Sequence, residues 1–356
     1  MDLSTFHLLN ENGFLSNESS LTIDKEILLK GYRAMLITRL VDARMITLQR
    51  QGLISFALSS LGEEACAVAS AAALDNKDWL YPQYREAGIM FWRGFSIQDY
   101  IHHMFCNAKD LNLGRQMPNH FGSKALNVVT VSSPIGTKIP HAAGAAYAMK
   151  LKKEDSITVC YFGEGATSEG DFHVGLNFAA VRKAPVIFFC RNNGYAISTP
   201  LKNQFLSKDV AIKGLAYGIE SFKVDGNDFF AVYAIVKKAR EICLTKQCPI
   251  LIEAVTYRAG AHSTSDDPTL YRLEAENEQW QKLCPITRLK HYLIRQNLWS
   301  EELDQKEIEE INREITASIE VAKNTSLPPL ESMIENVYFE VPQSLKDEFE
   351  EIKIIE

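Results

Sequence analysis

The stretch that decides the fold runs from Ser156 to Pro200 and reads SITVCYFGEGATSEGDFHVGLNFAAVRKAPVIFFCRNNGYAISTP. Residues 157–162 are apolar or β-branched and end at a pair of glycines, which predicts a buried strand entering a tight turn. A helical pattern follows and stops before Pro185, and residues 186–190 predict a second buried strand. A strand, a helix and a parallel strand form a right-handed βαβ unit, so both strands end at the same edge of the sheet.

Polar residues follow both strands at this shared edge, where the ligands of open α/β sheets usually bind. Glu164 follows the first strand, and Asn193 follows the second strand 29 positions later. A carboxylate, an amide oxygen and a backbone carbonyl just beyond it form a hard-oxygen set that suits Mg²⁺. Gly163 and Gly165 let the backbone approach a phosphate, and Arg191 supplies a fixed positive charge. The pattern therefore predicts a diphosphate held through a metal ion.

Composition narrows the class of protein and its partners. The chain has 356 residues, a net charge of −7 and no basic run, which argues against nucleic acid as a partner. Its seven cysteines are scattered and lack metal-site spacing, as in a reducing compartment. Residues 1–20 show no secretory signal and are short of arginine, and no apolar run is long enough to span a membrane. These features predict a cytoplasmic protein.

The order of strands and helices predicts an α/β fold with a doubly wound parallel sheet and helical extensions at both ends. Residues 1–24 are interpreted as an N-terminal arm. Residues 25–356 are interpreted as a single domain with a C-terminal helical extension, because the chain shows no internal repeat and no low-complexity linker.

Capping residues mark the expected helix starts. Asp24 precedes a long helix that should end near Gly52. Thr167 or Ser168 is expected to cap the helix of the βαβ unit, and Asn227 to cap a later helix.

The central motif resembles a known cofactor signature. Gly163-Glu164-Gly165, followed by 26 residues and Asn192-Asn193, is similar to the thiamine diphosphate motif, with Glu where many members have Asp. The longer string resembles the alpha subunit of the branched-chain 2-oxo acid dehydrogenase decarboxylase component. The pyruvate and acetoin types are similar, but less so.

The resemblance implies a thiamine diphosphate-binding fold and an enzyme that works only with a beta subunit. In the family, two alpha and two beta chains assemble, and the beta chain supplies a glutamate to the aminopyrimidine ring of the cofactor. The enzyme decarboxylates a branched-chain 2-oxo acid and transfers the acyl group to a lipoyl-bearing acyltransferase. Neither nucleic acid nor a membrane is an expected partner.

The resemblance also assigns site residues. His262 follows a strand in a long polar loop and matches a histidine that contacts the diphosphate and faces the substrate, so it is the candidate catalytic residue. His120 lies in a loop similar to one near the family's active-site mouth. The implied Mg²⁺ ligands are Glu164, Asn193 and the Tyr195 carbonyl; the implied cofactor-binding residues are Tyr84, Arg85, Ser133, Ile135, Gly165, Ala166, Arg191 and His262.

A second ion enters through the same resemblance. The branched-chain family binds K⁺ in the loop that matches Ser132, Pro134 and Thr137, with a glutamine oxygen at the position of Lys138. Lysine offers no lone pair to a cation. Either one ligand is replaced by water and K⁺ still binds, or the ammonium group of Lys138 takes the place of the ion.

Three other functions are alternatives to this interpretation. Use of the same cofactor on pyruvate stays open, because the size of the substrate pocket cannot be read from sequence. A nicotinamide dehydrogenase is disfavoured, since Ser168 stands where a third glycine is expected and no acid ends the next strand. A catalytically silent scaffold subunit would be expected to lack some of the predicted metal ligands, and all of them are present.

Ser263 matches a regulatory serine of some family members, but the second such position is Leu273, which argues against control by phosphorylation.

Overall fold

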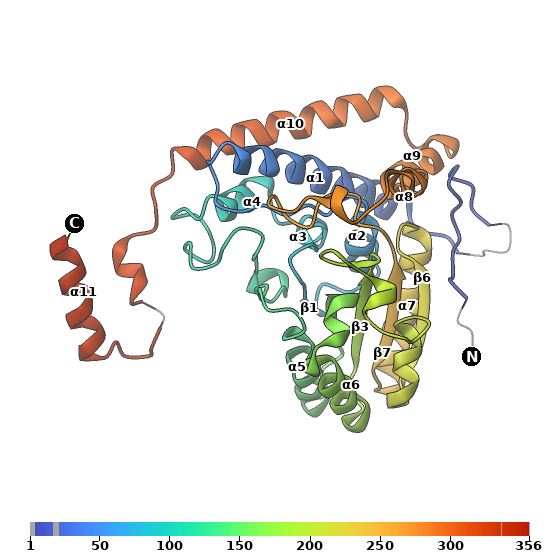
Figure 1. Cartoon of the computed structure of the whole chain (residues 1–356), viewed down its shortest axis with the longest axis horizontal. Helices are drawn as coiled ribbons and strands as arrows, with labels where there is room; N and C mark the ends of the chain where they lie inside the picture. Colours follow the sequence, from blue (N-terminus) through green and yellow to red (C-terminus); the bar gives the residue numbers. More distant parts are fainter. Residues whose placement is uncertain (1–3, 17–20, 336, 356) are drawn as a thin grey trace.

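The computed structural model describes residues 4–16, 21–335 and 337–355, and its centre is a five-stranded sheet (Figure 1). The strand order is β1-β2-β3-β7-β6, and every neighbouring pair runs parallel. The α/β class predicted from the sequence is therefore confirmed. The strands are β1 (Trp79–Tyr81), β2 (Thr158–Gly163), β3 (Val186–Asn192), β6 (Glu220–Asp225) and β7 (Ile250–Val255).

Helices account for most of the remaining regular structure. None of those in the described ranges is long and apolar enough to cross a membrane. The α-helices are α1 (Lys25–Arg50), α2 (Glu64–Ala72), α3 (Ala87–Arg93), α4 (Ile97–Met104), α5 (Lys138–Lys152), α6 (Gly170–Arg182), α7 (Phe229–Lys246), α8 (Glu274–Gln281), α9 (Pro285–Arg295), α10 (Glu301–Lys323) and α11 (Gln343–Ile355).

Both faces of the sheet are covered by helices, and each face has its own core. Helices α5 and α6 pack together on one face, and α2 and α7 pack on the other. Successive side chains of a strand point to opposite faces. Val159 and Tyr161 accordingly join the core on the α2 and α7 side, whereas Cys160 and Phe162 join the core on the α5 and α6 side. Burial on both faces explains why β2 reads as a continuous apolar run.

The helix caps agree only in part with the sequence. Asp24 caps α1 by accepting a hydrogen bond from the backbone N–H of Glu26, as predicted. The predicted caps of α6 are wrong, because Glu169 occupies the N-cap position and the hydroxyl of Thr167 instead accepts from Lys213. Asn227 does not cap α7 either. Its amide is bound to the loop carbonyl of Leu283, so the neighbouring residue, Asp228, is the cap.

Residues 4–16 lie along the open edge of β6. Phe6 forms a parallel bridge with Val224, and two backbone hydrogen bonds hold it there. The backbone N–H groups of Leu8 and Leu9 both donate to the buried carboxylate of Asp228, at 2.6 Å each. The cap of α7 therefore also fastens the N-terminal segment to the domain.

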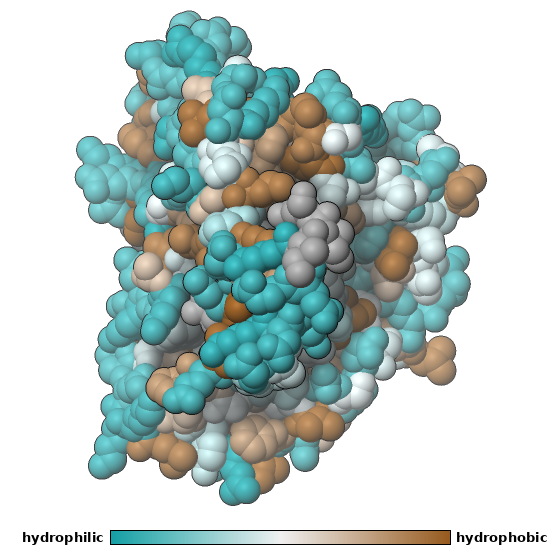
Figure 2. All heavy atoms as spheres, turned by 90° about the vertical axis from the view of Figure 1, so that its left-hand side faces the viewer, coloured by the Kyte–Doolittle hydropathy of each residue, from teal (hydrophilic) through white to brown (hydrophobic). Residues whose placement is uncertain are grey.

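The C-terminal segment extends away from this body. After α10, which packs on α1 and α4, the chain leaves the helical layer and ends in α11 at a distance from the sheet (Figure 1). Apolar side chains lie among hydrophilic ones on this side of the molecule (Figure 2). Phe339 is fully exposed, and Leu327 and Tyr338 are largely exposed.

A close approach of α1 and α7 depends on a glycine. A methyl group added at Gly31 would lie 2.5 Å from the ring of Phe229, whose side chain is completely buried. At Gly144 in α5, by contrast, an added methyl group meets no atom within 4 Å.

We expect Gly31→Ala to destabilise the protein by about 1–3 kcal/mol, because the extra carbon overpacks the core. Gly144→Ala is the matched control and should stabilise the chain by about 0.5–1 kcal/mol through higher helix propensity. Urea unfolding of both variants measures the two free energies. Equal effects of the two substitutions would show that α1 and α7 are not closely packed at Gly31.

Candidate active site

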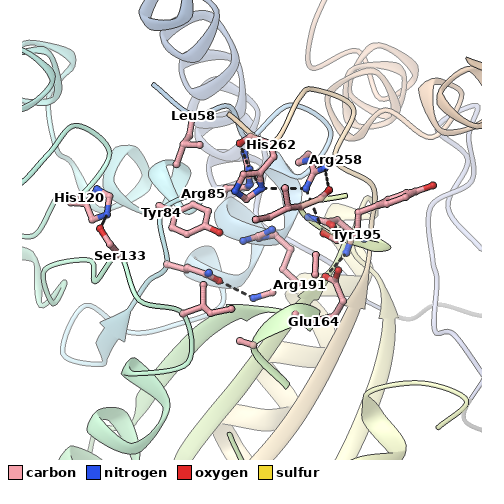
Figure 3. Close-up of a pocket in the computed structure, with 18 of the residues that line it drawn as sticks. Leu58, Tyr84, Arg85, His120, Ser133, Glu164, Arg191, Tyr195, Arg258 and His262 are labelled. Carbon is pink, nitrogen blue, oxygen red and sulfur yellow. Dashed lines mark hydrogen bonds between the residues drawn. The ribbon is translucent and has the colours of Figure 1, made fainter. Parts of the chain in front are cut away.

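One cavity of about 500 Å³ opens at the carboxyl ends of the central strands (Figure 3). The structure brings most of the predicted cofactor and magnesium residues together on its walls, although they come from distant parts of the chain. The predicted residues that line it are Tyr84, Arg85, Ser133, Ile135, Glu164, Gly165, Ala166, Arg191, Asn193, Tyr195 and His262. His120 also lines it, together with residues that sequence reasoning missed, including Phe56, Leu58, Gln83, Met117, Ile197 and Arg258.

The predicted metal ligands meet at one corner of this cavity. Glu164 follows β2 and is 1% exposed. One carboxylate oxygen accepts from the backbone N–H of Asn193, and the other accepts from the side chain of Gln204, each at 3.3 Å. The amide of Asn193 is oriented in turn by Glu63, to which it donates at 2.6 Å. The sequence motif did not reveal Glu63 or Gln204, because neither belongs to it and their contacts with its residues arise only in the folded chain.

Glu164 forms no ion pair among the described residues, and the charge of Arg191 only partly opposes the cost of its burial. Burial raises the pKa of its carboxyl group, and the hydrogen bond from Gln204 only opposes this effect. No lysine or arginine of the described residues forms an ion pair with it. A buried carboxylate of this kind would be stabilised by a bound cation.

The donor set fits Mg²⁺ in particular. A carboxylate, the side-chain oxygen of Asn193 and the carbonyl of Tyr195 are all oxygen ligands. The described residues contain no cluster of three or more His, Cys, Asp or Glu side chains that could enclose a metal. A site with so few protein ligands suits a magnesium ion that shares its coordination with phosphate and water.

Arg191 has a different setting from the one predicted. It lies next to the last residue of β3 and lines the cavity, but Nε donates to Glu86 at 2.8 Å and Nη1 donates to Glu63 at 3.1 Å. All three side chains are buried. Two carboxylates therefore already balance its charge.

Two other arginines at the cavity are held by backbone carbonyls. Arg85 donates to the carbonyls of Ser59 and His262, and burial lowers the pKa of its guanidinium group. Arg258 donates to the Ile197 carbonyl at 2.7 Å, while its Nε is buried without a partner among the described residues. Neither forms an ion pair in the described part of the chain. Both are suited to binding an anion such as a phosphate.

A signal for Arg258 was present in the sequence. It comes shortly after β7, a parallel strand next to β3, so it lies at the same edge as Arg191. The strand-end argument that selected Arg191 also applies to Arg258.

His262 sits between these two arginines. Its Nδ1 lies 3.2 Å from Arg85 and 3.5 Å from Arg258, and since both guanidinium groups are donors, Nδ1 accepts and the ring proton is on Nε2. Burial, followed by the charge of Arg85, lowers its pKa to about 4. Asp266 fixes the loop by accepting from the backbone N–H of His262 at 2.6 Å. The imidazole is therefore neutral at pH 7.

His120 faces Ser133 on another wall of the cavity (Figure 3). Nδ1 lies 3.0 Å from the carbonyl of Pro118 and therefore donates to it, so Nε2 accepts from the Ser133 hydroxyl at 2.6 Å. Burial lowers the pKa of this histidine as well. His120 thus fixes the orientation of the Ser133 side chain.

The loop predicted for K⁺ surrounds a smaller cavity of about 10 Å³, which lies beside the main one and which Ser132, Pro134 and Lys138 line. The hydroxyl of Thr137 lies 3.0 Å from the Ser132 hydroxyl and 3.1 Å from the Pro134 carbonyl oxygen. Lys138 is half-buried there, and burial lowers the pKa of its ammonium group.

Comparison with known proteins agrees with this geometry. Residues 32–331 match the family model described as the dehydrogenase E1 component. The chain belongs to this family. Curated relatives of the E1 family are similar over almost the whole chain, and the predicted resemblance is confirmed.

Three of these relatives carry the same kind of name. The mitochondrial 2-oxoisovalerate dehydrogenase subunit alpha 2 of Arabidopsis thaliana is 46% identical over 96% of this chain and 73% of its own length. The mitochondrial subunit alpha of Caenorhabditis elegans is 46% identical over 92% of this chain and 77% of its own length. The mitochondrial subunit alpha of Homo sapiens is 44% identical over 98% of this chain and 78% of its own length.

The names of these E1 relatives correct one prediction. All three are named as mitochondrial proteins, which contradicts the cytoplasmic location predicted from the N-terminal residues and the cysteines. The seven cysteines are indeed free thiols. Free thiols indicate a reducing environment, but they do not distinguish one reducing compartment from another.

The low pKa of His262 predicts a pH effect on stability. Between pH 4 and pH 6.5 the unfolded chain binds a proton on this histidine that the folded chain does not bind. The free energy of unfolding should therefore fall as the pH is lowered from about 6.5 to about 4. Above this range the histidine is neutral in both states, so its titration should no longer change the stability.

We expect His262→Asn to lack this part of the pH dependence. Urea unfolding of wild type and variant from about pH 7.5 down to about pH 4.5 measures it, and the stability of wild type relative to the variant should decrease toward acid. A constant difference over the whole range would show that the histidine keeps its ordinary pKa in the folded state.

Proposed function

We propose that this chain is the alpha subunit of a decarboxylase component that uses thiamine diphosphate and Mg²⁺ on branched-chain 2-oxo acids. The observation that carries the proposal is the placement of charge in one cavity. Glu164 is a buried carboxylate, Arg85 and Arg258 are buried guanidiniums, and none of the three forms an ion pair within the described residues. A magnesium diphosphate supplies a charge of opposite sign to each of them.

The walls of the cavity support an aliphatic substrate. Phe56, Leu58, Met117 and Ile197 present apolar side chains to the same space as the charged residues. A branched aliphatic side chain would bury its surface against such walls. The E1 relatives are named for 2-oxoisovalerate, which has a side chain of this type.

The chain's own residues would hold the cofactor at its two ends. Glu164, the Asn193 side chain and the Tyr195 carbonyl would hold Mg²⁺, while Arg85 and Arg258 would bind the diphosphate. Backbone N–H groups at Gly165 and Ala166 would also bind the phosphates, and Gly165 is needed because an added Cβ would lie 2.8 Å from that of Ala196. Tyr84, His262 and the carboxylate-paired Arg191 would lie near the diphosphate, and Ser133 and Ile135 would lie at the ring portion of the cofactor.

Catalysis would divide between the cofactor and these residues. When bound, thiamine diphosphate supplies the electron sink for decarboxylation. His262 is neutral and carries its proton on Nε2, so it can donate a hydrogen bond from that atom to an oxygen of the substrate. Its Nδ1 is occupied by two arginines, which hold the ring in one orientation.

A second chain is part of the proposal. The described residues form only one parallel sheet and no second domain that could supply a carboxylate to the aminopyrimidine ring. Apolar side chains remain available for a partner, since Val174 and Val181 of α6 are more than 60% exposed and Phe339 is fully exposed. We propose an assembly of two alpha and two beta chains, which passes the acyl group to a lipoyl-bearing acyltransferase and has the mitochondrial location named for the relatives.

The complete chain should be inactive by itself and active with its beta subunit. We expect turnover of 2-oxoisovalerate with thiamine diphosphate, Mg²⁺ and a lipoyl domain only when both chains are present. Glu164→Ala should abolish Mg²⁺-dependent cofactor binding measured by calorimetry, because it removes the buried carboxylate ligand. Glu169→Ala, which changes an exposed carboxylate five residues away, is the matched control and should bind normally.

Two results would contradict the proposed function. Robust turnover by the purified single chain would show that no beta subunit is needed. Near-normal cofactor affinity in Glu164→Ala would show that the metal is held elsewhere.

Lys138 is proposed to replace the potassium ion of the family. Its ammonium group has the same charge and remains tethered to the loop that contains the Ser132 hydroxyl and the Pro134 carbonyl. The side chain is half-buried, it lines the small cavity, and it forms no ion pair in the described part of the chain. The remaining space of about 10 Å³ holds no more than roughly one water molecule.

We therefore expect the stability and cofactor affinity of the assembly to be unchanged when K⁺ is exchanged for tetramethylammonium at the same ionic strength. Lys138→Gln should create a dependence on K⁺, because it removes the tethered charge and restores an oxygen ligand. Thermal unfolding in the two salts measures both effects. Loss of the cofactor from the wild-type assembly without K⁺ would exclude this role for Lys138.

A further inference from the structure

Gln204 contacts the candidate metal ligand Glu164, which lies 40 residues earlier in the chain. It follows a short antiparallel hairpin of β4 (Tyr195–Ala196) and β5 (Thr199–Pro200). Its side-chain Nε2 donates to a carboxylate oxygen of Glu164 at 3.3 Å and to the backbone carbonyl of Thr199 at 3.0 Å. The hairpin therefore carries the amide back to the residue that follows β2.

These two hydrogen bonds determine which way the amide points. Both acceptors are oxygens without a proton to donate. The opposite orientation would place the amide oxygen of Gln204 against the Glu164 carboxylate and the Thr199 carbonyl, where three acceptors would repel one another. The nitrogen must therefore face these two groups, and the oxygen must face away from them.

The amide oxygen is left in an unusual state. Oε1 of Gln204 is buried and has no hydrogen-bond partner among the described residues. Buried polar atoms in folded proteins are almost always paired, and an unpaired one costs free energy. The amide oxygen of Gln204 thus needs a donor that does not come from the described protein residues.

We propose that Gln204 is a positioning residue for the divalent cation, whose amide N–H group holds Glu164 and whose amide oxygen accepts a hydrogen bond from a water molecule on the metal. This inference rests on the proposed function, because it requires Mg²⁺ at Glu164. Mg²⁺ keeps several of its waters, and each such water directs its lone pair to the metal and its protons outward. The amide that holds the metal carboxylate through its nitrogen carries a buried oxygen without a donor, and such an oxygen can accept from a water of this kind.

If Gln204 has this role, its loss should change the affinity for the metal more than the affinity for the cofactor. Gln204 does not line the main cavity, so it is not expected to touch the diphosphate itself. Its loss should weaken the metal and leave the other cofactor contacts in place. Partners that orient a metal ligand in this way typically change metal affinity by about 10–100-fold when they are removed.

The test uses the complete assembly of this chain with its beta subunit and the variant Gln204→Met, which has similar length but no amide. Mg²⁺ is titrated at saturating thiamine diphosphate, and cofactor binding is followed by thermal shift and calorimetry. We expect the Mg²⁺ concentration for half-maximal binding to rise about 10–100-fold. The cofactor affinity at saturating Mg²⁺ should change by less than about 3-fold.

Asn203→Ala is the matched control, since it changes the exposed neighbour on the same turn and should leave both values unchanged. Unfolding without metal and cofactor tests whether Gln204→Met folds normally. If it does not fold, Gln204→Asn serves instead, because its amide is one methylene too short to reach Glu164 and should weaken Mg²⁺ in the same direction.

The outcomes distinguish this inference from the proposed function. If wild type binds the cofactor with Mg²⁺ and the folded variant needs no more Mg²⁺ than wild type, Gln204 does not position the metal and its oxygen pairs with an ordinary trapped water. An equal loss of Mg²⁺ and of cofactor affinity at saturating Mg²⁺ would also overturn the inference. If wild type itself shows no Mg²⁺-dependent cofactor binding, it is the proposed function that fails.

Discussion

The candidate site depends on a buried network in which Glu63 and Glu86 hold Arg191. Arg191 lies near the end of β3, Glu63 precedes α2, and Glu86 precedes α3, so a single guanidinium joins the central strand to two helix starts. Charges buried to this degree are tolerated only when they are paired, and removing one partner of such a pair typically costs about 3–5 kcal/mol. Glu63 also receives the amide of Asn193, so the same network orients a candidate metal ligand.

The network explains how charge is distributed over the cavity. Because Arg191 is balanced by two carboxylates, it adds little net positive charge to the site. Arg85 and Arg258 lack such partners in the described residues and are held instead by backbone carbonyls. Glu164 is held by neutral donors. Paired charges therefore build the frame, and unpaired charges mark where a ligand of opposite sign would bind.

The same electrostatics sets the state of His262. Two neighbouring guanidinium groups and burial make a protonated imidazole unfavourable, and the donors at Nδ1 leave the ring proton on Nε2. The loop that presents this ring is fastened by Asp266, which accepts from the His262 backbone and from the Tyr271 hydroxyl. The two arginines that would bind the anion therefore also keep His262 neutral and fix the orientation of its ring.

The sequence by itself determined the βαβ unit, the parallel sheet and the meeting of Glu164 with Asn193, because apolar runs and strand ends are local features whose geometry follows general rules. Only the tertiary structure decided which charges are free. Arg191 was predicted to face a phosphate, and its pairing with Glu63 and Glu86 depends on residues more than 100 positions away. Thr167 does not cap α6, because that helix begins after Glu169 and the Thr167 hydroxyl binds Lys213 instead. Gln204 meets Glu164 only through the hairpin between them. Side-chain partners of this kind are set by packing between distant segments, which no local pattern of residues encodes.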